Sequence, residues 1–172
     1  QGSGKTQTAV LAALDLLHKK YKKKIVISRP VVRNNIGFLP GEMQAKMENQ
    51  IAPIKHCMYE AYGVESIDKY FANKVIEILP VDFMKGITYV NSVVIIDEFQ
   101  DLDYEEFILT LTRLGKDSKV IYTGSAEQID KSVRNSCINH VLKLKDNPLV
   151  NFHTLKENHR NNVIFEIIKA ME

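Results

Sequence analysis

Residue types that bind phosphate stand at the start of the sequence. The segment Gly2-Ser3-Gly4-Lys5-Thr6 matches the second half of the G-x-x-x-x-G-K-[ST] loop, and a helical pattern follows it directly. Glycines let backbone N–H groups close around phosphate oxygens, and a helix N-terminus adds positive potential. Lys5 is then expected to reach the β- and γ-phosphates, and the Thr6 hydroxyl to ligate Mg²⁺. The competing interpretation is a Gly-Ser linker that happens to end in Lys-Thr.

Two acids end the most hydrophobic stretch of the sequence. Val93–Ile96 is an apolar run, and Asp97 and Glu98 follow it. A buried strand that ends in acids places them at the crevice where open α/β sheets bind ligands. We expect Asp97 to hold Mg²⁺ through water and Glu98 to orient or deprotonate an attacking water. An acidic helix cap after a strand is the alternative, but the upstream Lys5-Thr6 pair favours nucleotide hydrolysis over binding alone.

Further polar and basic residues are candidates to act on a γ-phosphate. Gln128 follows a later strand, and we assign it to the nucleotide and to catalysis, with Ser125 or Thr123 assisting. Arg160 or Arg113 could supply a guanidinium that stabilises charge in the transition state, and Arg160 is the stronger candidate. A turn built of small polar residues and ordinary surface ion pairs are the competing interpretations.

Cations and aromatic side chains follow two other predicted strands. Arg29 ends one strand, and Arg33 and Phe38 lie in the long loop after it, while Phe83 and Lys85 follow the next strand. Phosphates require cations, and bases can stack on aromatic rings. We take Arg29, Arg33, Phe38 and Lys85 as candidate nucleic-acid contacts. The pattern is equally compatible with both phenylalanines packing in the core and the cations being merely solvated.

Hydrophobic periodicity predicts the elements that position these residues. Apolar residues at helical spacing predict helices over residues 6–21, 40–62 with an interruption at Pro53, 103–114, 137–144 and 162–171. Short β-branched runs predict strands over residues 24–28, 75–79, 92–96 and 119–123 and around Phe152. Continuous apolar strands alternating with helices predict a mainly parallel sheet with helices on both faces. We therefore expect one α/β domain over residues 1–172, truncated at its N-terminus, with its first strand upstream of Gln1.

Composition limits the class of protein. The chain has 172 residues, of which 26% are charged, and a formal net charge of +2. These values suit one folded domain, and the net charge is too small to predict a polyanion partner by itself. Cys57 and Cys137 lack the spacing of a disulfide framework or a zinc site. No apolar run approaches the roughly 18 residues of a membrane span, so we expect a cytoplasmic protein without a membrane partner.

Several short motifs occur in a fixed order along the chain. They are Ser28-Arg29-Pro30, Gly37–Glu42, Phe83–Gly86, Ile96–Gln100, Thr112–Gly115, Ser118-Lys119, Thr123-Gly124 and Gln128–Asp130. Together with the phosphate loop, these motifs resemble the PhoH-like ATPases, the phosphate-starvation-inducible family of bacteria and phages. The resemblance extends from Gln1 to about Asp130. Beyond it, Leu155–Arg160 is similar to the L-x-x-N-Y-R motif of superfamily-one helicases.

The resemblance implies a RecA-like P-loop core that uses ATP with Mg²⁺ and a helicase-like motif set associated with RNA. It supports the roles given above to the phosphate loop, the two acids and Gln128. It also makes Arg29 and the Gly37–Gly41 loop better candidates for nucleic-acid contact. The family usually has Asp where Ser125 stands, Arg where Lys85 stands and Ala where Phe99 stands. Lys85 keeps the charge but not the bidentate fork of arginine. These departures indicate a divergent member, from a bacterium or encoded by a phage.

The leading expectation is therefore a Mg²⁺-dependent ATPase that acts as a helicase-like motor on RNA or single-stranded DNA. One RecA-like domain provides one face of the usual ATP cleft, so we expect a homo-oligomer to complete it. One alternative is the first motor domain of a two-domain superfamily-one helicase. The other is a nucleotide-dependent switch that binds ATP and a protein partner.

Overall fold

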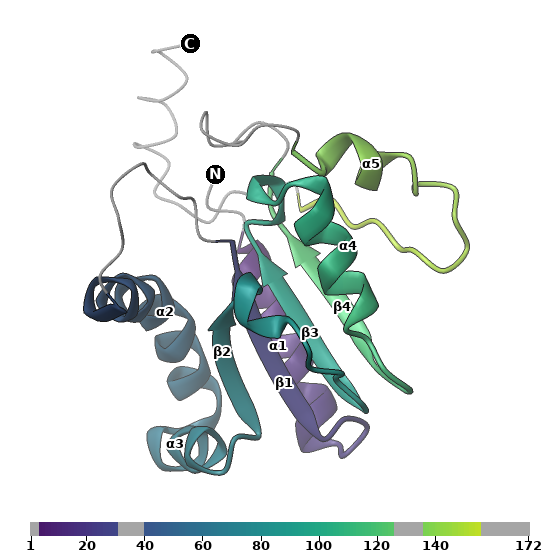
Figure 1. Ribbon diagram of the computed structural model, residues 1–172. Helices are drawn as coiled ribbons and strands as arrows, with labels where there is room; N and C mark the ends of the chain where they lie inside the picture. The colour runs from purple at the N-terminus through teal and green to yellow at the C-terminus, as the bar shows by residue number, and fades with distance from the viewer. Residues whose placement is uncertain (1–3, 31–39, 126–135, 156–172) are drawn as a thin grey trace, which may run out of the picture.

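A parallel sheet of four strands forms the centre of the molecule. The computed structural model describes residues 4–30, 40–125 and 136–155, and for residues 40–50 it describes the backbone alone. The strands lie in the order β2-β1-β3-β4, and each neighbouring pair is parallel (Figure 1). Their bounds are β1 Lys24–Arg29, β2 Ile76–Pro80, β3 Ser92–Asp97 and β4 Lys119–Thr123. Because all four run the same way, their carboxyl ends meet at one edge of the sheet.

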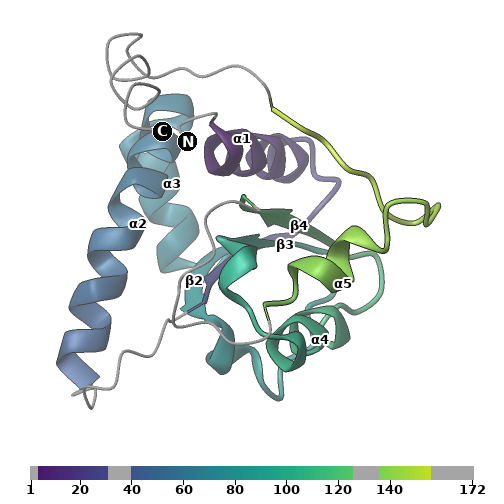
Figure 2. The same cartoon turned by 90° about the horizontal axis from the view of Figure 1, so that it is seen from above.

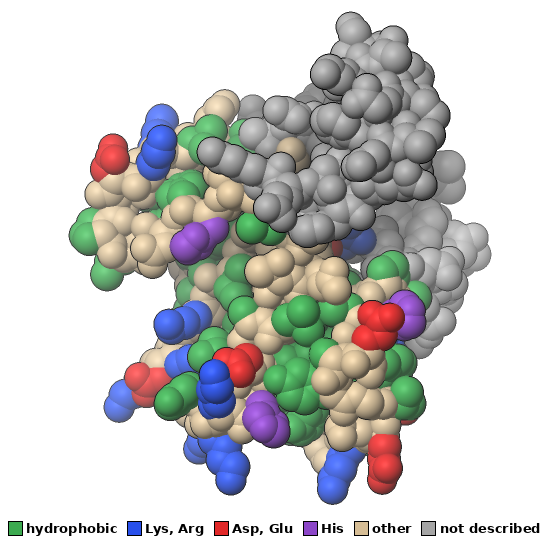
Figure 3. Space-filling model, turned by 180° about the vertical axis from the view of Figure 1, so that it is seen from behind, with side chains coloured by type: hydrophobic (Ala, Val, Ile, Leu, Met, Phe, Trp, Pro, Cys, Tyr) green, Lys and Arg blue, Asp and Glu red, His purple; other side chains and the backbone are tan. Residues whose placement is uncertain are grey.

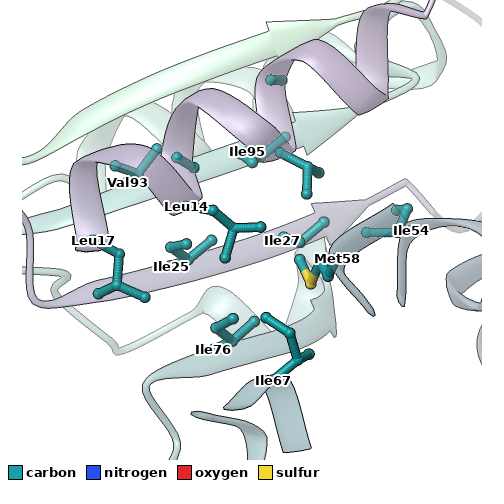
Figure 4. Close-up of a cluster of buried hydrophobic side chains, with 13 residues drawn as sticks. Leu14, Leu17, Ile25, Ile27, Ile54, Met58, Ile67, Ile76, Val93 and Ile95 are labelled. Atoms are coloured by element: carbon teal, nitrogen blue, oxygen red, sulfur yellow. The ribbon is translucent and has the colours of Figure 1, made fainter. Parts of the chain in front are cut away.

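Helices α1 (Lys5–His18), α2 (Pro40–Tyr62) and α3 (Val64–Ala72) pack on one face of the sheet. Successive side chains of a strand point to opposite faces, so every second strand residue enters this layer. The resulting cluster is drawn in Figure 4, which labels Leu14, Leu17, Ile25, Ile27, Ile54, Met58, Ile67, Ile76, Val93 and Ile95. This layer fixes α1, whose first residues carry the phosphate-loop lysine and threonine.

The opposite face is covered by the short 3₁₀ helix η1 (Val81–Met84) and by helices α4 (Tyr104–Thr112) and α5 (Ile138–Leu142). Figure 2 shows α1 on one side of the sheet and α4 and α5 on the other. The intervening strand residues Val26, Val94 and Ile96 are fully buried in this second layer. The expected α/β class with helices on both faces is therefore confirmed, and the arrangement is consistent with a RecA-like P-loop core.

Several predicted elements differ in the structure. Helix α2 has the predicted bounds but continues through Pro53 without the predicted interruption. One proline removes a single backbone donor, while buried Ile54 and Met58 hold the next turns of the helix against the core. The strand expected around Phe152 is absent, because residues 150–155, which end the described chain, form no strand. Helix α5 is shorter than predicted, and the helix predicted over residues 162–171 lies outside the described residues.

A basic rim lies at the amino edge of the sheet. Lys and Arg side chains gather at the lower end of the face shown in Figure 3. Acids accompany several of them: the Lys19 ammonium lies 2.8 Å from the Asp15 carboxylate, and Lys24 pairs with Glu77. These lysines lie at the opposite edge from the strand ends that carry the candidate site. Across the described ranges, no helix combines the length and the apolar character needed to cross a bilayer.

The thiol of Cys137 is expected to be unreactive in the folded protein. Burial raises the pKa of Cys137 to about 12, and its Sγ donates to the Phe99 carbonyl oxygen at 3.3 Å. The thiolate is the reactive form, and a raised pKa keeps the thiol protonated up to a higher pH. At pH 8 we expect a Cys57→Ser variant to react with an aromatic disulfide reagent about 1000-fold more slowly when folded than in denaturant. Rapid stoichiometric labelling of the folded variant would contradict this placement of Cys137.

Candidate functional site

The N-terminus of α1 lies at the carboxyl edge of the sheet. Gly4 is the N-cap residue and adopts a left-handed conformation with φ 70° and ψ 19°, which glycine tolerates without strain. No side chain caps the helix. An N-terminus of this kind, with Lys5 as its first residue, is suited to binding an anion through backbone N–H groups and a charge. Gly2 and Ser3 lie outside the described residues.

Asp97 joins three elements of the site. The Thr6 hydroxyl donates to Asp97 Oδ1 at 2.6 Å, and the Thr123 hydroxyl donates to the same oxygen at 2.7 Å. The Asp97 side chain is 5% exposed, so these contacts hold a buried carboxylate in one orientation. The structure thus brings together both predicted metal residues, which stand 91 positions apart in the sequence. Thr123, considered above as an aid to Gln128, contacts Asp97 in the structure.

The donor set of Thr6 and Asp97 fits Mg²⁺. This ion takes oxygen ligands, keeps several waters, and is usually held by one or two protein groups plus substrate phosphates. A hydroxyl and a carboxylate 2.6 Å apart beside the helix N-terminus provide such groups. In the described part of the chain, no three or more His, Cys, Asp or Glu side chains are grouped so that they could hold a metal ion. An all-protein metal cage is therefore not formed by these residues, and none is needed for a magnesium–nucleotide complex.

Glu98 is held at both carboxylate oxygens. Its Oε1 lies 3.2 Å from Nη2 of Arg29, and its Oε2 accepts a hydrogen bond from Nε2 of Gln100 at 2.6 Å. Its backbone is left-handed, with φ 54° and ψ 44°, a conformation that residues other than glycine rarely adopt and that is frequent at functional sites. The side chain is 34% exposed, so a water can reach a carboxylate whose orientation is already fixed.

Arg29, a predicted nucleic-acid contact, lies beside the two acids of the site. Its Nη2 lies 3.6 Å from Asp97 Oδ2 in addition to the Glu98 contact. The register of β1 and β2 pairs Arg29 with Pro80, so η1 begins beside it. Sequence reasoning missed the pairing with Glu98, because nothing local links residues 69 positions apart.

The other nucleic-acid candidates are placed only in part. Phe83 is 58% exposed, so it does not tuck into the core. The Lys85 ammonium lies 3.7 Å from the Asp82 carboxylate and its side chain is 68% exposed. Both residues belong to the segment that follows β2, whose last residue, Pro80, is paired with Arg29. Arg33 and Phe38 lie outside the described residues.

Two of the predicted γ-phosphate residues, Gln128 and Arg160, lie outside the described residues. Arg113 is described, and it lies away from the site: its backbone oxygen accepts from the Tyr89 N–H at 2.8 Å, near the amino ends of β3 and β4. Ser125 approaches the site through its backbone, since its N–H donates to Oε1 of Gln100 at 3.1 Å.

Gln100 is the site residue that sequence reasoning left without a role. It lies in the 3₁₀ helix η2 (Phe99–Asp101), directly after the acids, and is 1% exposed. The motif Asp-Glu-Phe-Gln contains it, but its partners became visible only in three dimensions.

Comparisons with known proteins identify the family of this chain. A family model described as PhoH-like protein matches residues 1–172. A PhoH-like protein of Bacillus subtilis is 36% identical over 131 residues, which are 75% of this chain and 41% of that protein. The protein PhoH of Escherichia coli is 32% identical over 133 residues, which are 75% of this chain and 38% of that protein. This chain thus spans about two fifths of the length of these relatives. Because the family model matches residues 1–172, the chain belongs to the PhoH-like family, as the motif resemblance predicted.

Proposed function

We propose that the protein binds ATP with Mg²⁺ and hydrolyses it. The observation that supports this most is the meeting of three groups at one edge of the sheet: the α1 N-terminus, the Thr6–Asp97 pair and the oriented carboxylate of Glu98. Membership of the PhoH-like family, which suggests a P-loop NTPase, points the same way.

Each residue has a defined task in this proposal. Lys5 and the first N–H groups of α1 bind the β- and γ-phosphates. Thr6 and Asp97 hold Mg²⁺, which neutralises phosphate charge when bound. Glu98 orients the attacking water and takes up its proton. Gln128 and Arg160 are proposed to act on the γ-phosphate, and hydrolysis in this account needs a second copy of the chain to close the cleft.

The same edge supports a nucleic-acid-dependent motor. Exposed Phe83 can stack on a base, and exposed Lys85 can contact a phosphate. Arg29 connects this surface to hydrolysis, because it contacts Glu98. We therefore propose RNA or single-stranded DNA as the partner.

Single-stranded RNA is expected to raise ATP turnover by the full-length protein about fivefold or more. A Lys85→Ala variant should need more RNA for half-maximal stimulation and should lower the slope of log affinity against log salt by about 1, since one phosphate contact is lost. Steady-state phosphate release against poly(U) concentration at several salt concentrations measures both effects.

The matched control is Lys119→Ala. This lysine is also exposed, but it begins β4 at the amino edge of the sheet. We expect it to leave stimulation and salt slope unchanged. Turnover that is indifferent to both RNA and single-stranded DNA would contradict the motor proposal and favour a nucleotide-dependent switch that binds a protein partner.

A further inference from the structure

We propose that Gln100 is a positioning residue that ties the backbone after β4 to the carboxylate of Glu98. The inference rests on the proposed role of Glu98 in hydrolysis. It concerns a side chain that would touch neither ATP nor the metal and would act through Glu98.

The Gln100 side chain makes hydrogen bonds at both ends. Its Nε2 donates to Glu98 Oε2 at 2.6 Å, and its Oε1 accepts the Ser125 N–H at 3.1 Å. A primary amide has one donor end and one acceptor end, and this bridge uses each of them. Glutamate at this position could accept from Ser125 but would repel Glu98. Methionine would fill similar space and lose both bonds.

The backbone after β4 lies directly against the Gln100 side-chain amide. A Cβ atom added at Gly124 would lie 2.1 Å from Gln100 Oε1 and 2.7 Å from a ring carbon of Phe99. Such separations are far below contact distance, so a side chain at Gly124 would displace the amide. The backbone of Gln100 is anchored separately, since the Ser136 hydroxyl donates to its carbonyl oxygen at 2.5 Å. The amide therefore lies between its own anchored backbone and the backbone at Gly124 and Ser125. Its position depends on that second segment.

The end of β4 consequently contacts both acids of the site. Thr123 bonds Asp97 directly, and two residues later Ser125 reaches Glu98 through Gln100. The other oxygen of Glu98 pairs with Arg29, whose side chain is 31% exposed. Without the amide, this more exposed ion pair alone would orient the carboxylate. Misorientation of a catalytic group by about 1 Å can cost about 100-fold in rate.

The test compares ATP hydrolysis by the full-length wild type, Gln100→Met and Gln100→Glu. We expect kcat to fall about 10- to 100-fold in both variants while the ATP dissociation constant stays within about twofold. Thermal melts of each variant establish that it is folded, and two variants of different polarity keep the test informative if one of them does not fold.

A double variant separates positioning from general destabilisation. If Gln100 acts through Glu98, adding Gln100→Met to Glu98→Gln should lower single-turnover rates by less than about twofold further. The same fractional loss in both backgrounds, or a change in ATP affinity with kcat unchanged, would overturn the inference. If the wild type hydrolyses no ATP, or if Glu98→Gln leaves its turnover unchanged, the proposed function is overturned, and the inference with it.

Discussion

A Glu98→Gln variant is expected to lose about 10²- to 10⁴-fold in ATP turnover while it still binds ATP with Mg²⁺. The amide has nearly the same shape as the carboxylate but cannot take a proton from water. The contacts of Glu98 with Arg29 and Gln100 show that its two oxygens are already oriented. The substitution therefore removes the proton acceptor and keeps a side chain of similar shape in its place. Phosphate release at saturating ATP, beside nucleotide affinity measured by calorimetry, reports the two effects separately.

The matched control for this prediction is Glu105→Gln. Glu105 is exposed in the first turn of α4 and has the same charge as Glu98. Its substitution should leave turnover unchanged. Full turnover by Glu98→Gln would show that another group activates the water.

A Lys5→Ala variant is expected to weaken ATP binding about 10- to 100-fold, because a charge-assisted contact with the phosphates is lost. Lys5 begins α1 directly after the left-handed Gly4, so its loss leaves the helix N-terminus in place but removes its full positive charge. Titration of the variant with a fluorescent ATP analogue measures the change.

Lys23→Ala is the control for charge alone, since Lys23 is exposed at the amino edge just before β1. It should bind the analogue as wild type does. Equal affinity of Lys5→Ala and wild type would place the phosphates elsewhere.

Strands β1 and β3 were predictable because they are buried on both faces. The run Lys24–Ser28 differs from β1 by one residue, and the prediction for residues 92–96 differs from β3 by one residue. A strand covered by helices on both sides must be apolar along its whole length, and such runs stand out in a sequence. Helix α4 has a further local determinant in the structure, because Asp103 and Glu106 form a capping box at its N-terminus.

Elements with little burial were harder to predict. Helix α3 was missed, and Ile67 is its one buried residue. The strand expected around Phe152 rested on a single aromatic residue, which is 41% exposed in the structure. Where few side chains reach the core, the periodicity that marks an element is weak.

Some contacts of the candidate site were predictable from the sequence, and others were not. The proximity of Thr6 and Asp97 was predictable, because a motif places Thr6 and a rule about sheet edges places Asp97. The contacts of Arg29 and Gln100 with Glu98 were not predictable, because they depend on how separate elements pack. Gln100 reaches Ser125 across 25 positions, and only the adjacency of β3 and β4 makes that contact.

Phosphate release from ATP by the full-length protein, with Mg²⁺ and with a chelator, tests most directly whether this edge of the sheet hydrolyses ATP. We expect turnover that requires Mg²⁺ and is lost in Glu98→Gln, which still binds ATP. Wild type that binds ATP with Mg²⁺ but releases no phosphate, alone or with RNA, would contradict hydrolysis at this site. Turnover that persists in the chelator would contradict the assignment of Thr6 and Asp97 to the metal.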